Sequence, residues 1–159
     1  MKIFPSNNYI FKIVGEEKET IERLKRRTEM SESLTSQITD KSFRGMIKDN
    51  SFKIISSVIG KGAFCVLSGE IINQEGEVKI EINKVFRNLF SLFLCLPIIG
   101  FIAQFFSKNE ELSMTFLLLI LQVLMIRYVF IEFAFRIFSK ASLNRLIDVL
   151  DISYIEKID

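Results

Sequence analysis

The chain has 159 residues, a formal net charge of +2 and no histidine. The small net charge and the lack of a basic stripe with interleaved aromatic residues argue against a nucleic-acid partner. The absence of histidine removes the commonest general base and the commonest metal ligand. No phosphate loop, metal-ligand cluster or nucleophile elbow occurs in the sequence. We therefore predict no catalytic residue, no cofactor and no metal ion, and we predict that the protein is not an enzyme.

The charged residues are unevenly distributed along the chain. Residues 1–87 contain 15 of the 21 basic and 12 of the 19 acidic residues, whereas residues 88–126 contain only Lys108, Glu110 and Glu111. The first part has the composition of a soluble domain and the second that of helices in lipid. The N-terminal residues contain no apolar run of the roughly 7–15 residues that a secretory signal peptide needs. We expect the first membrane-engaging helix to follow the soluble domain.

A strand and a helix are expected first. Residues 9–14 are rich in aromatic and β-branched side chains, which is typical of a strand. Residues 16–29 carry acidic residues in the first turns and basic residues in the last, which matches a helix dipole, and Glu19 and Arg23 have the spacing of an i,i+4 ion pair. The basic end is either a solvated helix end or a patch for lipid headgroups. Residues 30–40, rich in Ser and Thr, are expected to form an exposed loop.

Four strands joined by short turns are expected next, at residues 41–48, 52–59, 63–73 and 77–85. Glycine or asparagine in the connections indicates hairpins, and together the strands form a small antiparallel β-meander. In the fourth strand, apolar residues from Val78 onward alternate with polar residues that end at Asn83, so we expect one buried and one wet face. Gly45 and Gly69 lie inside strands and are expected to mark bulges or close contacts with a helix.

The two cysteines are expected to stay unpaired. Cys65 lies in the third strand of the meander, and Cys95 lies in an apolar helix. Because these two positions are not expected to meet, we predict no disulfide and a reducing compartment for Cys65.

Two apolar runs predict a transmembrane hairpin. Residues 88–107 form a run of 20 residues without a charge. A helix of that length is about 30 Å long and crosses the hydrocarbon core of a bilayer. After a turn at residues 107–111, the second span occupies residues 112–131 and is broken only by Gln122 and Arg127. The predicted fold is therefore that of an α+β membrane protein.

Five polar residues in or beside the spans are candidates for coupling to the membrane or to a partner: Gln104, Gln122, Arg127, Glu132 and Arg136. Arg127 falls about 8 Å inside the far boundary of the bilayer. An ionisable residue within a span indicates a function, whereas one near its edge is more often an anchor, and both interpretations stay open. Glu132 and Arg136 are four apart and are expected to pair, whereas Arg127 and Glu132, five apart, are not expected to share a face.

Basic residues near the spans predict an orientation. Six of them flank the hairpin: Lys79, Lys84, Arg87, Arg136, Lys140 and Arg145. Only Lys108 lies between the spans. The positive-inside rule then places both termini in the cytoplasm and the protein in the inner, cytoplasmic membrane as a multi-pass protein.

A helix and a short tail are expected after the hairpin. Residues 139–150 have apolar side chains at helical spacing. This amphipathic helix either folds back onto the apolar face of the sheet or lies on the membrane surface. Residues 151–159 are expected to be an extra strand or a tail.

The predicted domain organisation has three parts. A cytoplasmic β-rich domain covers residues 1–86, and the transmembrane hairpin covers residues 87–138. The C-terminal helix and tail cover residues 139–159 and are predicted to pack on the β domain.

A resemblance supports this order of elements. Residues 43–54 have the pattern F-x-G-x-I-x-x-N-x-F-x-I, and a later G-x-I stands at residues 69–71, ahead of two apolar helices. With these motifs the chain resembles an uncharacterised group of small bacterial membrane proteins, in which a β-meander is followed by two transmembrane helices. The resemblance covers residues 41–159 and implies the fold without an activity.

Three functions are compatible with this sequence. The favoured one is a membrane-anchored, non-enzymatic interaction or regulatory module, with the lipid bilayer and a protein partner or a second copy as partners. The second is a membrane-perturbing or pore-forming effector that acts through the hairpin. The third is a binder of a small lipid or apolar ligand between sheet and helix, which needs an apolar cavity. Eight side chains would fill that space instead: Phe43, Phe52, Ile54, Phe64, Val66, Val78, Ile80 and Leu146.

Overall fold

The computed structural model describes residues 4–35, 37–57, 62–106 and 112–158, apart from the side chains of residues 62, 103–106 and 112–115. It is an α+β structure with a mixed seven-stranded sheet and two helices that are long and apolar enough to cross a membrane. The predicted turn at residues 107–111 lies outside the described residues.

The chain divides into two compact units. The sheet unit consists of Pro5–Asn83 and Phe135–Asp159, and the hairpin unit consists of Met1–Phe4 and Lys84–Ala134. The hairpin is thus an insertion in the sheet unit, linked to it after Asn83 and again after Ala134. The C-terminal residues, predicted as a third part, belong to the sheet unit.

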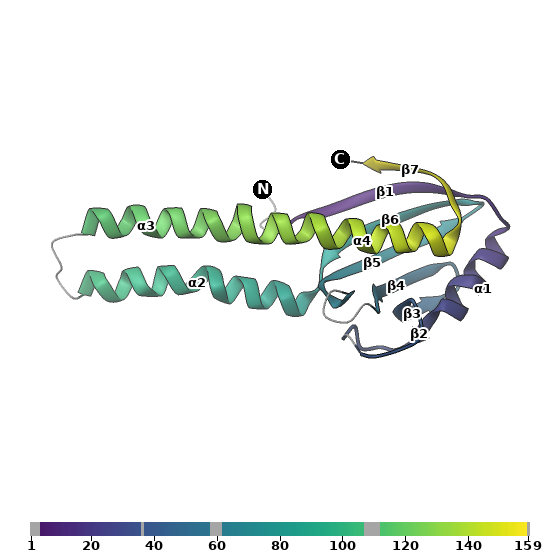
Figure 1. Ribbon diagram of the computed structural model, residues 1–159, viewed down its shortest axis with the longest axis horizontal. Coiled ribbons are helices and arrows are strands. Elements are labelled where there is room, and N and C mark those ends of the chain that lie inside the picture. Colours follow the sequence, from purple (N-terminus) through teal and green to yellow (C-terminus); the bar gives the residue numbers. More distant parts are fainter. Residues whose placement is uncertain (1–3, 36, 58–61, 107–111, 159) are drawn as a thin grey trace. The chain divides into compact units, whose positions relative to one another are not determined.

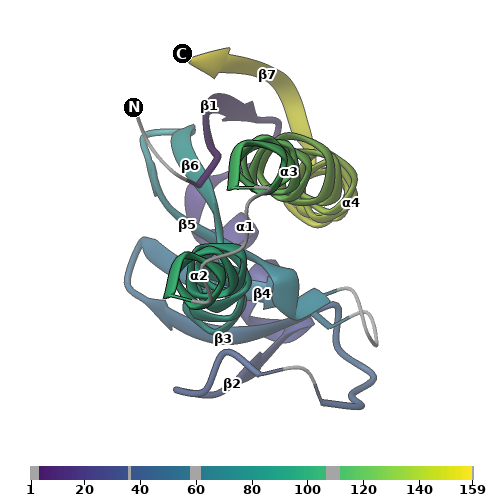
Figure 2. The same cartoon turned by 90° about the vertical axis from the view of Figure 1, so that its left-hand side faces the viewer.

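The sheet has the strand order β2-β3-β4-β5-β6-β1-β7. Only β2 and β3 are parallel, and every other neighbouring pair is antiparallel. Figure 2 shows β7 and β2 at opposite edges of the sheet. The strands are β1 (Ser6–Ile13), β2 (Thr28–Met30), β3 (Phe43–Lys48), β4 (Ser51–Ser56), β5 (Cys65–Ile72), β6 (Glu75–Ile82) and β7 (Ile152–Ile158).

The strands β3 to β6 confirm the four predicted runs, and β1 confirms the N-terminal strand. Of the two options for the last residues, the strand is right, because β7 pairs with β1. The loop predicted from residue 30 is wrong at its first position. Met30 ends β2 and pairs in parallel with Gly45. A three-residue strand gives no alternation that a sequence pattern reveals.

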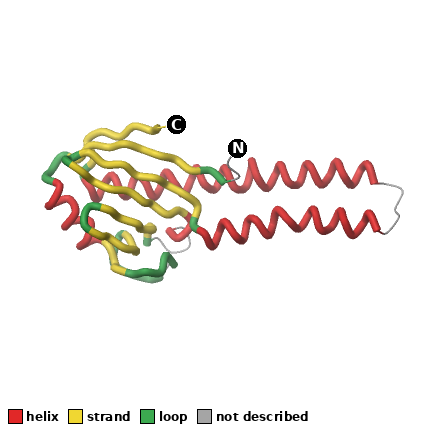
Figure 3. Tube along the Cα trace, turned by 180° about the vertical axis from the view of Figure 1, so that it is seen from behind, coloured by secondary structure: helices red, strands yellow, loops and turns green. Residues whose placement is uncertain are grey.

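Two helices pack on the sheet within the sheet unit. Helix α1 (Glu17–Arg27) buries Ile21 and Leu24, and α4 (Glu132–Leu150) buries apolar residues from Phe135 to Leu150. The two helices lie on the same face of the sheet. They are in front of the strands in Figure 1 and behind them in Figure 3. Of the two positions expected for the C-terminal helix, the α4 residues after Phe135 therefore take the one on the apolar face of the sheet. A 3-10 turn, η1 (Gly62–Phe64), precedes β5, and the Phe64 ring contacts the Phe138 ring at a centroid distance of 4.9 Å.

The core between this face and the helices is filled by side chains. All eight residues that would fill the space of an apolar ligand are buried: Phe43, Phe52, Ile54, Phe64, Val66, Val78, Ile80 and Leu146. The register places one of them, Val66, on the opposite face of the sheet from Ile54 and Ile80. No observation in the described part of the chain therefore favours a lipid bound at this place.

Gly45 and Gly69 mark close approaches between neighbouring strands. A Cβ atom at Gly69 would lie 2.1 Å from the Glu77 carbonyl oxygen and 2.7 Å from Cζ of Phe52. Gly45 has φ of +149°, and a Cβ atom there would lie 2.2 Å from the Lys53 carbonyl oxygen. The ladders pass both glycines without a register shift. The expected bulges or helix contacts are therefore wrong, because the crowding comes from the adjacent strands.

The hairpin unit contains α2 (Lys84–Phe106), α3 (Leu112–Leu124) and the π-helical segment η2 (Met125–Ile131). One stripe of α2 is half-buried at helical spacing: Phe90, Leu94, Pro97 and Phe101. The Phe101 ring contacts the Phe116 ring of α3 at a centroid distance of 5.6 Å. Most of the remaining surface of both helices is apolar and uncovered, and only 6% of the most apolar window of each is buried.

Candidate functional site

The second apolar helix changes its hydrogen-bond pattern over η2. The backbone is right-handed helical at both ends of this segment, at Leu124 and Glu132. A π-helix has i→i+5 hydrogen bonds, is rare, and occurs frequently at functional sites. No proline or glycine lies in Met125–Ile131, so the sequence carries no helix-breaking signal that predicts this change. The segment therefore marks the hairpin's candidate site.

The π-helical pattern brings Arg127 and Glu132 together. Nη1 of Arg127 donates to Oε2 of Glu132 at 3.3 Å, and the two side chains are 18% and 31% exposed. The prediction that these residues do not share a face is wrong. In an α-helix, residues five apart point about 140° away from each other, since one turn takes 3.6 residues. In a π-helix, each turn holds more residues, so positions five apart lie one above the other.

The Arg127 guanidinium makes a second contact, with an aromatic ring. Cζ of Arg127 lies 5.4 Å from the centroid of the Tyr128 ring, within the range of a cation–π interaction. An isolated charge in an apolar environment is unfavourable, and pairing with a carboxylate and an aromatic face offsets part of that penalty. The hairpin therefore holds a compensated pair of charges in its second helix.

The other three candidates are not part of this pair. Gln122 is exposed on α3, and Arg136 is exposed on α4 in the sheet unit. The side chain of Gln104 lies outside the described residues. The pairing of Glu132 with Arg136 stays a prediction.

Sequence reasoning missed Asn83, the last residue of the sheet unit before α2. Asn83 was expected on the wet face of its strand, but it is only 5% exposed. Its Nδ2 donates to the carbonyl oxygens of Leu34 and Ala63, both at 2.9 Å, and its backbone N–H donates to Phe64 at 2.8 Å. Burial is tolerated because these donors are satisfied. The one signal in the sequence for this role is the position of Asn83, a side chain with two N–H donors placed where the strand gives way to the helix.

Comparisons with protein-family models, with curated proteins and with solved structures find no match to this chain. The resemblance to a group of small bacterial membrane proteins stays a prediction.

Proposed function

We propose that the chain is a membrane-anchored, non-enzymatic interaction or regulatory module. In this proposal the hairpin unit crosses the bilayer, and the sheet unit binds a protein partner or a second copy. The proposal is carried by one observation: two long helices whose apolar surface their own chain leaves uncovered. A core helix of a soluble protein would be buried by its own chain. In lipid, such helices are stable because their backbone groups are bonded internally.

The edge strand β7 supports an interaction role for the sheet unit. Strand β7 pairs only with β1 and ends the sheet. Tyr154 and Ile158 are 56% and 40% exposed on it. An exposed edge strand presents backbone donors and acceptors that another chain can pair with. We therefore propose β7 as the place where the partner adds a strand.

Membrane flotation tests the anchor. The full chain should float with membranes in a density gradient after alkaline extraction, since aggregates do not float. A variant with two lysines in each span, Leu96→Lys with Ile99→Lys and Leu118→Lys with Leu121→Lys, should lose flotation, because each lysine near mid-membrane costs about 3 kcal/mol of insertion and neither span then anchors the chain. The matched variant with alanine at the same four positions should still float. A wild-type chain that stays in the soluble fraction would overturn the proposal.

Purification in a mild, non-denaturing detergent tests the partner. We expect a stoichiometric protein partner or a defined homo-oligomer. Tyr154→Lys with Ile158→Lys should weaken that association without unfolding the sheet, because lysine side chains on an edge strand discourage pairing with another chain and both positions are already exposed. A monomer that retains no partner would count against an interaction module.

One observation favours a second function, the membrane-perturbing effector. The hairpin carries an ion pair between Arg127, inside the π-helical segment, and Glu132, directly after it. Paired ionisable residues in spans often line pathways for ions. Overexpression should then depolarise cells, and Arg127→Leu or Gln122→Leu should relieve the effect, whereas the control Arg87→Leu should not. Overexpression without depolarisation would eliminate this candidate.

A further inference from the structure

We infer that a cleft of the sheet unit between α1, the start of β3 and α4 binds a phosphate group through Arg27 and Arg145. The cleft has a volume of about 300 Å³. It is lined by Arg23, Arg27, Ser42, Arg145, Asp148 and Val149. The inference goes beyond the proposed function and holds whether or not the hairpin enters a membrane, since all six residues belong to the sheet unit.

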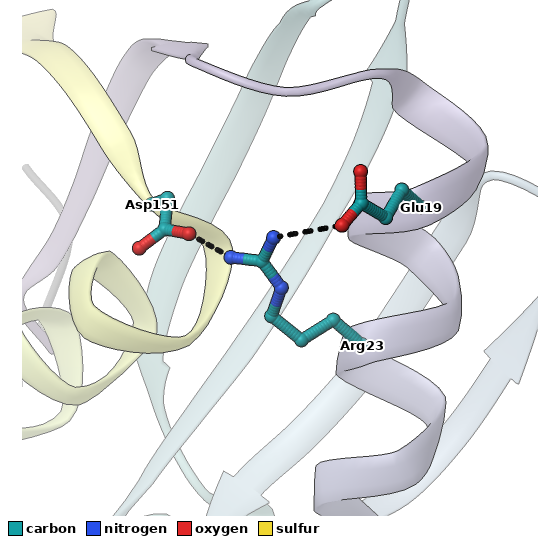
Figure 4. Close-up of polar contacts among 3 residues, drawn as sticks. All are labelled: Glu19, Arg23 and Asp151. Atoms are coloured by element: carbon teal, nitrogen blue, oxygen red, sulfur yellow. Dashed lines mark hydrogen bonds and ion pairs between the residues drawn. The ribbon is translucent and has the colours of Figure 1, made fainter.

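Arg23 forms one wall of the cleft and is already neutralised. Its guanidinium lies between the carboxylates of Glu19, at 3.5 Å, and Asp151, as Figure 4 shows. The pair with Glu19 confirms the predicted i,i+4 contact. The pair with Asp151 joins α1 to the turn that follows α4. Arg23 therefore fixes the two helices that carry the other arginines and does not itself supply a free charge.

Arg145 lines the cleft from α4, and most of its N–H donors are available. It is half-buried on α4, and its Nη1 donates to Oγ of the buried Ser56 at 3.1 Å. A guanidinium has five N–H donors, so most of them are available to a ligand. No carboxylate of the described residues lies within ion-pair distance of this side chain.

Arg27 is the last residue of α1 and lines the same cleft. Its side chain is exposed, and it makes no hydrogen bond or ion pair with another residue in the described part of the chain. Ser42, directly before β3, adds a hydroxyl to the lining of the cleft. The planar fork of arginine binds two phosphate oxygens at once, which a lysine cannot do. Two arginines from different elements therefore offer a phosphate group two such forks.

Asp148 lowers the positive charge of the cleft. This exposed carboxylate lines the cleft and has no ion-pair partner among the described residues. With Arg23 neutralised, Arg27, Arg145 and Asp148 leave a net charge of one positive unit. A phosphate monoester carries about −1.5 to −2 at pH 7, which more than neutralises this net charge, and its three terminal oxygens can accept from both guanidinium forks. The ligand class is a phosphate monoester or a pyrophosphate, either on a soluble molecule or in a lipid headgroup.

The full chain in detergent tests the inference by calorimetric titration at fixed ionic strength, with pyrophosphate in one arm and a short-chain phosphatidic acid in the other. Arg27→Gln and Arg145→Lys should each weaken binding by about tenfold, because each removes a charge-assisted fork. Asp148→Asn should strengthen it by about threefold. The control Arg26→Gln removes an equal charge from the same helical turn but not from the cleft, and it should leave binding unchanged.

The two arms distinguish the sources of the phosphate. Binding of pyrophosphate supports a soluble ligand, and binding of phosphatidic acid alone supports a lipid headgroup. No binding in either arm would overturn the inference. Equal losses in Arg26→Gln and Arg27→Gln would also overturn it, because they would indicate attraction to the whole basic helix end. Circular dichroism of Arg145→Lys separates lost binding from lost folding.

Discussion

The sheet has no room for a side chain at Gly69. Gly69→Ala should destabilise the sheet unit by about 3 kcal/mol, since its Cβ would meet the Glu77 carbonyl and the Phe52 ring. Gly15→Ala is the matched control, because its Cβ would lie 3.7 Å from Oγ1 of Thr20, at ordinary contact distance. Urea unfolding followed by circular dichroism measures both. Equal stabilities of the two variants would contradict the steric argument.

Cys65 gives the sheet unit a pH dependence. Burial raises the pKa of this thiol from 9.0 to about 12. A folded-state pKa above the unfolded one stabilises the fold fully below about pH 9, and this contribution is lost as the pH rises toward about 12. Compared with Cys65→Val, the wild type should lose on the order of 1 kcal/mol of unfolding free energy per pH unit in this window. Both proteins should carry Cys95→Ala, and parallel pH profiles would contradict the prediction.

The residue scale also shows what a sequence leaves open. Gly69 was recognisable as a special position, because glycine within a strand is unusual. Which atoms crowd it was not recognisable, since that depends on the register of two neighbouring strands. The burial of Asn83 was not recognisable either, because its two acceptors come from segments 49 and 20 residues away in sequence.

At the scale of the element, the π-helical segment η2 should depend on its ion pair. Arg127→Met or Glu132→Gln should each destabilise the hairpin by about 3 kcal/mol, since each breaks the ion pair between these two half-buried side chains. The double variant should cost less than the sum of the two, because both charges are then absent. Thermal unfolding in detergent measures this cycle, with Lys140→Met on exposed helix surface as the control. Additive effects would show that the pair is not coupled.

The end of β6 should depend on the Asn83 amide. Asn83→Asp should destabilise the sheet unit by about 3 kcal/mol or more, because a carboxylate would face the carbonyl oxygens of Leu34 and Ala63. Asn144→Asp, on the exposed side of α4, should change the stability little. Denaturant unfolding compares the two. An Asn83→Asp variant with unchanged stability would show that the amide donors contribute nothing to folding.

At the scale of the whole molecule, the distribution of basic residues predicts an orientation. A fluorescent reporter at the C-terminus should fold in the cytoplasm, and alkaline phosphatase inserted between the spans should be active outside. Lys108→Glu should leave both results unchanged, because it removes the one basic residue that opposes this orientation. A C-terminus found outside would contradict the prediction.

The sequence alone determined most of the helices and strands and the two apolar runs. Strand periodicity, turn residues and apolar length are local properties, so they are visible in any short window of the chain. They also determined that β3 to β6 form a meander, since short turns leave little choice of partner.

The tertiary structure decided the rest, beginning with the apolar hairpin. The pattern of residues 112–131 predicted an apolar helix, but the extra residues per turn in η2 decided that Arg127 meets Glu132. The place of β1 between β6 and β7, and the cleft between Arg27 and Arg145, depend on contacts between segments far apart in the chain. Such contacts are set by packing over the whole fold, and no local pattern encodes them.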